Sequence, residues 1–279
     1  DSGAVAVIAQ TVQNYLSTTS MKEEQQNDDD NNNNEEESMR SKHREFLAYL
    51  IGADLWGNKA DLSFSGGVVV QDGNDDDDND SSNTETKSTT EQEIIHKELR
   101  TQYVVDDDSD VVIEEILNRS TVQSSSPPSY NFIVDNCGLE LVCDLFFAYG
   151  LIEAFRAKQV TFYVKTQPVF VSDAMTKDVY YTIERMEQCS DSRVSKFGQL
   201  FRQCIESGQW VIRSHKFLTS PTPFYEMDHD LYQRLRQSGQ MTILKGDANY
   251  RRLFNDRNYD IHEPFDVLVD NFPTDIVSL

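Results

Sequence analysis

The hydrophobic and polar positions of the chain alternate between short apolar runs and longer stretches with helical spacing. Residues 131–134 and 159–165 are apolar runs typical of buried strands, and residues 139–155 have the spacing of a buried helix. Further strands are predicted at 101–105, 209–214, 240–245 and 275–279, and further helices at 91–100, 108–119, 176–188, 196–208, 228–239 and 249–254. This order predicts an α/β fold, a three-layer α/β/α sandwich with a mostly parallel sheet.

Two other stretches with helical spacing, residues 4–16 and 41–55, precede the sheet and predict an N-terminal helical region. Long polar, acidic tracts interrupt the pattern and are expected to be disordered and solvated. The predicted organisation is a helical region over 1–70 with an acidic disordered tract at 22–40, an acidic disordered insert at 71–95, and an α/β/α core over 96–279.

The charge of the chain is concentrated in its acidic tracts. Residues 22–40 and 71–130 hold 24 acidic and 6 basic residues, and so carry 18 of the 23 net negative charges. The remainder is close to neutral and shows no basic stripe that could neutralise phosphates, which argues against a nucleic-acid partner.

The four cysteines show neither the paired spacing of a zinc site nor the density of a disulfide scaffold, so we expect reduced, intracellular thiols. No apolar run approaches the length needed to span a bilayer, and the first residues do not resemble a secretory signal. We expect a cytoplasmic protein without a membrane partner, with the nucleus left open as a second location. The start at Asp1, within a helical pattern, and the apolar end suggest that both ends are cut.

Three predicted strands are followed by polar residues that could form a site. Asp135 and Asn136 follow the first strand of the main run, Lys165 and Asp173 follow the next, and Lys245 ends a later one. In parallel sheets ligands bind where the carboxyl ends of the strands meet. Two carboxylates and an amide suit Mg²⁺ or Mn²⁺, and both lysines are expected to face the same opening, where they could bind phosphate.

Simpler interpretations exist for each of these signals. Asp135 and Asn136 could cap the following helix, and Asp173 could cap the next. The glycine turn after Lys245 could serve only backbone geometry. The acidic run 104–110 is a rival metal site, although a solvated helix start explains it better.

Other chemistries have less support. The five histidines never pair at metal-binding spacing. Neither a dinucleotide-binding nor a P-loop glycine motif is present, and no G-x-S-x-G nucleophile motif occurs.

Four motifs, "LWGNKADLS", "DNCGLELVCDL", "FYVKTQPVFVSDA" and "LKGDANYRRL", occur in that order. Together they resemble the metal-dependent damage-control phosphatase family, in the branch also described as acidic-residue methyltransferases. The resemblance covers roughly residues 41–70 and 96–275 and includes the spacing around "WVIRSHKFLTSPTPFYEM". It implies an α/β/α sandwich with an N-terminal helical bundle and hydrolysis of phosphomonoesters of small sugars or damaged phosphometabolites, such as fructose 1-phosphate.

The resemblance also implies roles for particular residues. Asp135, Asn136 and Asp173 would hold Mn²⁺, Ni²⁺, Co²⁺ or Mg²⁺ and form the catalytic centre. Glu140 would contact S-adenosylmethionine. The substrate, a small phosphorylated metabolite, would lie along Asp247, Ala248, Asn249, Tyr250 and Arg251, with Lys245 close by. Asn58 and Asp61 fall in a hallmark loop of the family that could reach the site, and Lys165 stays a substrate-binding candidate from its place after a strand.

One departure stands out, because this branch carries an Arg-Thr-x-Lys motif directly after a strand like "DIVSL", and the sequence stops at Leu279. Its lysine is expected to bind the substrate phosphate, so we expect a C-terminally truncated and impaired core. Two alternatives stay open: a carboxyl (glutamate) methyltransferase that uses S-adenosylmethionine, and a truncated, non-catalytic relative.

Overall fold

The computed structural model describes residues 2–23, 32–57, 107–121, 126–260 and 262–279. The helices are α1 (Ser2–Glu23), α2 (Asn32–Gly57), α4 (Ser109–Arg119), α5 (Leu139–Glu153), α6 (Thr176–Glu187), α7 (Ser192–Glu206), α8 (His229–Ser238), α9 (Asp247–Leu253) and α10 (Phe265–Leu268). The strands are β1 (Ser129–Ile133), β2 (Gln159–Val164), β3 (Trp210–Ser214), β4 (Met241–Leu244) and β5 (Asp275–Ser278). Two short 3-10 helices, η2 (Lys216–Thr219) and η3 (Phe224–Glu226), follow β3.

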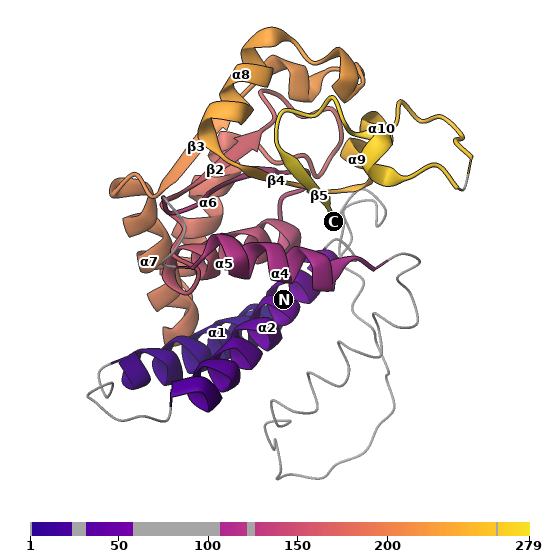
Figure 1. Ribbon diagram of the computed structural model, residues 1–279. Helices are drawn as coiled ribbons and strands as arrows, with labels where there is room; N and C mark the ends of the chain where they lie inside the picture. The colour runs from indigo at the N-terminus through magenta and orange to yellow at the C-terminus, as the bar shows by residue number, and fades with distance from the viewer. Residues whose placement is uncertain (1, 24–31, 58–106, 122–125, 261) are drawn as a thin grey trace, which may run out of the picture.

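The five strands form one parallel sheet in the order β3-β2-β1-β4-β5. Helices cover both faces, with α5, α6 and α7 on one side and α8, α9 and α10 on the other (Figure 1). The predicted α/β/α sandwich is therefore confirmed, and its sheet is entirely parallel across these strands. The direction of strand addition reverses between β1 and β4, which places a crevice at their carboxyl ends.

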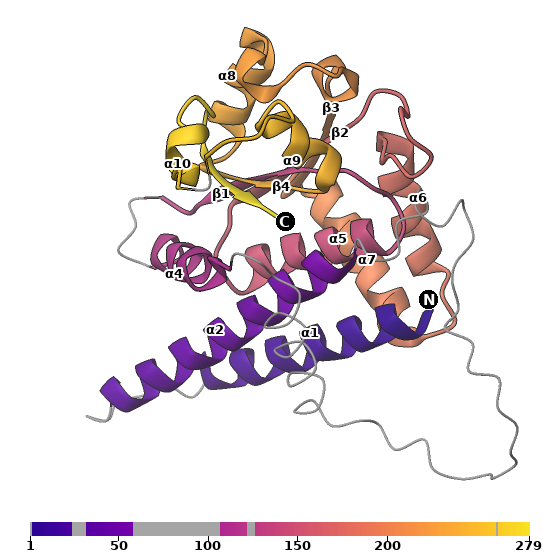
Figure 2. The same ribbon diagram turned by 90° about the vertical axis from the view of Figure 1, so that its right-hand side faces the viewer.

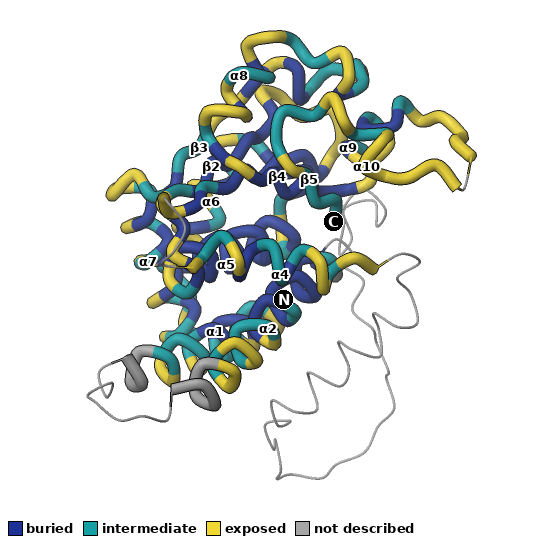
Figure 3. The backbone as a smooth tube through the Cα atoms, viewed as in Figure 1, coloured by how far each residue is buried: buried dark blue, intermediate teal, exposed yellow. Residues whose placement is uncertain are grey.

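Strand alternation divides the core into two hydrophobic clusters. Phe132 and Ile243 face the larger cluster, which contains α5 and α7, whereas Ile133 and Leu244 face the smaller cluster with η2, η3 and α8. Successive residues of a strand point to opposite faces of the sheet, so each strand supplies both clusters. Figure 3 shows the buried positions concentrated in the strands and in α5.

The helices α1 and α2 form an additional layer that packs on α5, as two perpendicular views show (Figures 1 and 2). This packing explains why α5 is buried on all sides from Glu140 to Ile152. At Gly150 of α5 an added Cβ would lie 2.6 Å from Leu50 Cδ1 of α2, so a glycine allows the two helices to approach. No helix in the described part of the chain is long and apolar enough to cross a membrane.

The structure corrects the prediction for the first acidic tract. Residues 32–40 belong to α2 and are helical instead of disordered. Part of the reason is long-range pairing, because Arg40 and Arg44 both form ion pairs with Glu114 of α4. The predicted insert 71–95, helix 91–100 and strand 101–105 lie outside the described residues.

Candidate metal and substrate site

The predicted site residues gather where the order of the strands reverses. Asp135 and Asn136 lie one residue beyond the end of β1, Lys165 directly follows β2, and Lys245 and Gly246 connect β4 to α9. The loop after Lys165 returns to this edge, since Asp173 forms an isolated antiparallel bridge with Asn136. The topology therefore brings residues from three connections to one edge of the sheet.

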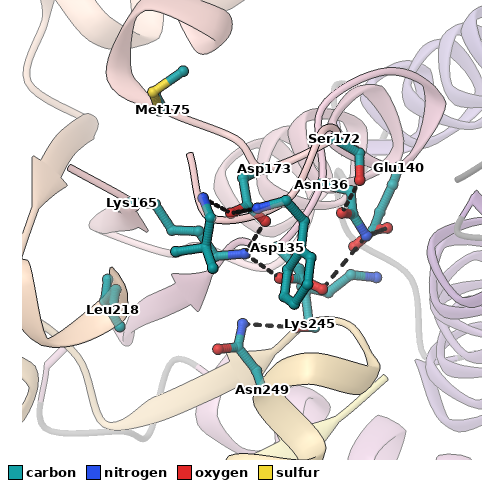
Figure 4. Close-up of polar contacts among 12 residues, drawn as sticks. Asp135, Asn136, Glu140, Lys165, Ser172, Asp173, Met175, Leu218, Lys245 and Asn249 are labelled. Carbon is teal, nitrogen blue, oxygen red and sulfur yellow. Dashed lines mark hydrogen bonds and ion pairs between the residues drawn. The ribbon is translucent and has the colours of Figure 1, made fainter. Parts of the chain in front are cut away.

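Two carboxylates converge on a single cation at this edge (Figure 4). Lys165 Nζ lies 2.5 Å from Asp135 Oδ1 and 2.5 Å from Asp173 Oδ1. All three residues are at most 5 % exposed. Burial raises the pKa of Asp135, and the Asp173 and Asp247 carboxylates act in the same direction, whereas Lys165 opposes the rise. A buried carboxylate pair with one cation between its oxygens is the arrangement expected of a site for a hard cation.

The second carboxylate oxygen of Asp173, Oδ2, binds the backbone of its own loop. Asp173 Oδ2 accepts hydrogen bonds from the backbone N–H groups of Val169 (2.6 Å) and Phe170 (2.8 Å). The carboxylate therefore fixes the loop 169–173 and leaves Oδ1 as the oxygen that it offers to a cation. Helix capping does not explain this residue, because α6 is capped at Met175 with the help of Asp178.

Asn136 connects the carboxylate pair to Glu140. Its Oδ1 accepts a hydrogen bond from Ser172 Oγ (2.8 Å), and its Nδ2 donates to Glu140 Oε2 (2.9 Å) and lies 3.4 Å from Asp135 Oδ2. In this orientation the amide nitrogen, and not the oxygen, lies on the side of Asp135. The N-cap of α5 is Gly138, without a side-chain capping bond, so the capping interpretation of Asp135 and Asn136 is wrong.

Glu140, the position that the resemblance assigns to S-adenosylmethionine, is 2 % exposed at the start of α5. Burial raises its pKa to about 7, and the nearby Lys245 and the bond from Asn136 oppose this rise. The Glu140 carboxylate accepts a hydrogen bond from Asn136 and so helps to fix the side chain of this predicted metal ligand.

Lys245 does not face the opening, contrary to our expectation. Its Nζ is 3.0 Å from the backbone oxygen of Asp54, 3.0 Å from Asp54 Oδ2 and 3.6 Å from Asp144 Oδ1, and the side chain is 1 % exposed. The physical reason is strand alternation: Leu244 faces the α8 side of the sheet, so the next residue points into the layer of α2 and α5. Lys245 ties these helices to the end of β4.

A cavity of about 520 Å³ opens beside the carboxylate pair. Four residues of the predicted substrate set line it, namely Lys165, Ala248, Asn249 and Arg251. Arg251 forms an exposed ion pair with Asp256 (Nη2–Oδ2 2.7 Å). Asn249 is buried and donates to the Lys245 backbone oxygen at 2.9 Å.

The other predicted substrate residues lie elsewhere. Tyr250 lines a separate cavity together with Leu279. Asp247 is exposed at the start of α9 and lines neither of these two cavities. Asn58 and Asp61 fall outside the described residues.

A largely apolar part of the cavity wall was missed in the sequence. It is formed by Val169, Phe170, Leu218, Pro221 and Arg252. Val169 and Phe170 are 55 % and 58 % exposed, which is unusual for large apolar side chains at a cavity rim. The signal in the sequence that could have indicated this part of the wall is the apolar triplet 169–171 within a polar loop.

Arg252 packs against two phenylalanine rings and so stabilises this part of the cavity wall. Its guanidinium carbon lies 4.8 Å from the ring centroid of Phe217 and 4.7 Å from that of Phe224, and it donates hydrogen bonds to the backbone oxygens of Phe217 and Thr222. Burial lowers its pKa to about 10, and Asp135 opposes this change. The residue joins α9 to the η2 and η3 segment.

A second cluster, made of His215, Asp228 and Asp230, could also hold a cation, because one potential ligand atom from each lies within 4.8 Å of the others. Its hydrogen bonds argue for a structural role. His215 Nδ1 accepts from the Phe217 N–H, so the ring proton lies on Nε2 and points to Asp230. Asp228 is the N-cap of α8 and accepts from the Leu231 N–H.

The fold and this edge define an α/β/α sandwich protein with a buried carboxylate pair and an adjoining cavity at the switch point of a parallel sheet. A sequence profile of the Damage-control phosphatase ARMT1-like domain matches residues 8–279, and the chain belongs to this family.

Relatives called Damage-control phosphatase ARMT1 are similar to this chain. The Homo sapiens protein is 33% identical over 226 residues, which is 80% of this chain and 47% of that protein. The Xenopus laevis protein is 30% identical over 250 residues (86% and 52%), and the Danio rerio protein is 32% identical over 241 residues (85% and 50%). The chain thus spans about half the length of the curated relatives that it matches. None of these names refers to methyl transfer, so the methyltransferase alternative gains no support from them.

Proposed function

We propose that this chain carries the catalytic site of a metal-dependent phosphatase that hydrolyses phosphomonoesters of small sugars or damaged phosphometabolites. Family membership supports the phosphatase class. The observation that carries the proposal is the convergence of Asp135 Oδ1 and Asp173 Oδ1 on one cation, Lys165, which also lines a cavity.

The carboxylate pair fits a divalent ion. A cation, the Lys165 ammonium, already stands between the two oxygens, and carboxylate oxygens are the ligands that Mg²⁺ and Mn²⁺ prefer. Asn136, beside Asp135, is the third predicted ligand; its Oδ1 accepts from Ser172 Oγ and its Nδ2 donates to Glu140, so the fit rests on the two carboxylates. When bound, the ion would polarise a phosphoryl oxygen and offset charge on the phosphate. The choice among Mn²⁺, Ni²⁺, Co²⁺ and Mg²⁺ belongs to experiment.

The remaining roles fall to residues of the cavity. The Val169 and Phe170 amides donate hydrogen bonds to Asp173 Oδ2 and hold the carboxylate in place. The orientation of Oδ1 is therefore fixed before the reaction begins. Arg251 can offer its guanidinium to phosphate oxygens once it leaves the exposed pair with Asp256, a pair that water and salt screen.

A purely non-catalytic relative would have little reason to keep this arrangement. Burying two carboxylates against each other costs free energy, and a single lysine compensates only part of it. Such strained electrostatics concentrate at functional sites. We therefore favour an enzyme over an interaction module.

The decisive experiment measures phosphate release from fructose 1-phosphate and p-nitrophenyl phosphate in EDTA and in each of the four divalent ions. Asp173→Asn should lose metal-stimulated turnover by about a hundredfold or more, because one ligand charge is removed while the loop keeps an oxygen acceptor. Asp110→Asn changes an exposed carboxylate in the first turn of α4 and serves as the matched control. Metal-stimulated turnover that survives in Asp173→Asn would overturn the proposal.

A further inference from the structure

We propose that Lys165 and the divalent ion compete for the same two carboxylate oxygens, and that the displaced ammonium group then binds the phosphate of the substrate. The inference rests on the proposed function of the site. It assigns to one lysine two positions, one between the carboxylates and one at the cavity wall.

The competition follows from the distribution of hydrogen bonds around Asp173. Its Oδ2 is committed to the Val169 and Phe170 amides, so Oδ1 is the oxygen left for a cation. Lys165 Nζ holds that same Oδ1 at 2.5 Å, together with Oδ1 of Asp135 at 2.5 Å. Metal–oxygen bonds of Mn²⁺ or Mg²⁺ are about 2.0 to 2.2 Å long, so an ion that reaches both oxygens would overlap the ammonium group.

Lys165 can move without a change of the backbone. Its N–H donates to the Ala174 backbone oxygen at 3.0 Å, which fixes the main chain at the end of β2. The side chain itself borders the 520 Å³ cavity. Rotation of the flexible four-carbon stem can therefore carry the ammonium group from the carboxylates to the cavity wall.

The charges favour this exchange. Around the site the three carboxylates of Asp135, Asp173 and Asp247 outnumber the two cations that act on them, Lys165 and Arg252, which leaves an excess of negative charge that attracts a divalent ion. Once the ion neutralises the carboxylates, the ammonium group loses its partners and faces the cavity as a free positive charge. A phosphate dianion is the natural partner of such a point charge.

The other cations described around this cavity are already engaged. Arg251 is paired with Asp256, and Arg252 is held between two phenylalanine rings and backbone oxygens. Lys245 is buried on the other side of the sheet edge with Asp54 and Asp144. Lys165 is thus the cation whose release depends directly on metal binding.

The test measures binding of Mn²⁺ alone to the whole chain by calorimetry at fixed pH. Lys165→Met removes the competitor, and Mn²⁺ should bind about tenfold to a hundredfold more tightly than to the unmodified protein. Lys165→Arg should bind Mn²⁺ more weakly, because a guanidinium holds two carboxylates more firmly than an ammonium group does. Lys158→Met, at the opposite end of β2 and exposed, is the control and should bind as the unmodified protein does.

A second titration adds inorganic phosphate to the Mn²⁺-loaded proteins, and Lys165→Met should bind phosphate about tenfold more weakly. If Lys165 only positions the carboxylates, Lys165→Met will lose Mn²⁺ affinity, and the inference is wrong. If Lys165→Met does not fold, tighter or equal Mn²⁺ binding to Lys165→Arg would overturn the inference instead. Failure of the unmodified protein to bind any of Mn²⁺, Ni²⁺, Co²⁺ and Mg²⁺ would remove the proposed function itself.

Discussion

Gly246 and Asp135 approach so closely that only a glycine fits at the turn between β4 and α9. A Cβ at position 246 would lie 2.0 Å from Asp135 Oδ2. The backbone of Gly246 also has φ +81°, a conformation that other residues adopt at a cost. The turn that follows β4 therefore shapes the space around a predicted metal ligand.

The first prediction concerns this contact. Gly246→Ala should abolish saturable Mn²⁺ binding and metal-stimulated turnover, because the new methyl group pushes the Asp135 carboxylate away from Asp173. Calorimetry with Mn²⁺ and a phosphate-release assay measure the two effects. We also expect a loss of roughly 1 kcal/mol or more in the free energy of unfolding from the backbone strain alone.

A matched control separates strain from steric overlap. Gly208 has φ +77°, but a Cβ there would meet nothing within 4 Å. Gly208→Ala should therefore show the stability loss without any change in Mn²⁺ affinity. Equal Mn²⁺ affinity in both variants would show that the contact between Gly246 and Asp135 has no part in the site.

The second prediction concerns the apolar rim of the cavity. Phe170 lines the cavity, and its backbone N–H donates to Asp173 Oδ2. Phe170→Ala keeps the backbone bond and removes the ring, so kcat/KM for fructose 1-phosphate or p-nitrophenyl phosphate should fall about tenfold, with unchanged Mn²⁺ affinity. Val171, which is 78 % exposed and does not line the cavity, provides the control Val171→Ala. Equal effects of both changes would exclude a substrate contact for Phe170.

The sequence predicted the sheet and the residues that follow its strands, because alternating apolar runs and helical spacing are local signals. It did not predict which face each residue occupies. Lys165 and Lys245 both follow strands, yet one borders the cavity and the other is buried beneath it. Attention to alternation after Leu244 would have separated them.

Long-range contacts explain what the sequence could not show. The pairing of Lys165 with two carboxylates depends on the return of the loop 169–173 to the edge of the sheet, which an isolated bridge between Asn136 and Asp173 records. Leu218 and Pro221, which also line the cavity, come from a segment after β3 whose place is set by packing. Neither feature leaves a local spacing pattern.

The third prediction concerns Arg252, which joins α9 to the η2 and η3 segment. Arg252→Lys loses the contacts with both phenylalanine rings and most of the hydrogen bonds to backbone oxygens. The free energy of unfolding, measured by urea titration, should fall by about 2 to 4 kcal/mol.

Arg234 offers the matched control for this change, because it lies on the surface of α8 in an exposed pair with Asp230. Arg234→Lys should leave the unfolding curve almost unchanged. A similarly small effect at position 252 would mean that the guanidinium group contributes little to the wall of the cavity.

The fourth prediction concerns the buried carboxyl of Asp144, which lies beside Lys245 and Asp54. Burial raises the pKa of Asp144 well above its ordinary value of 3.8, and the Asp54 carboxylate adds to the rise while Lys245 opposes it. The folded state therefore binds this proton more tightly than the unfolded state does. By linkage, that contribution to stability is complete at low pH and is lost as the pH rises above about 4 towards the folded pKa.

Asp144→Asn removes this titration while it keeps the shape of the side chain. The free energy of unfolding of the unmodified protein in EDTA, relative to that of the variant, should fall as the pH rises above about 4. Because the Asp54 and Glu140 carboxylates interact with Asp144, this difference reports the titration of the buried carboxyl cluster that contains Asp144. Asp110→Asn, at an exposed position of α4, should give a difference that stays flat. A difference that rises with pH would show that Asp144 is ionised in the folded state and acts as a counter-charge for Lys245.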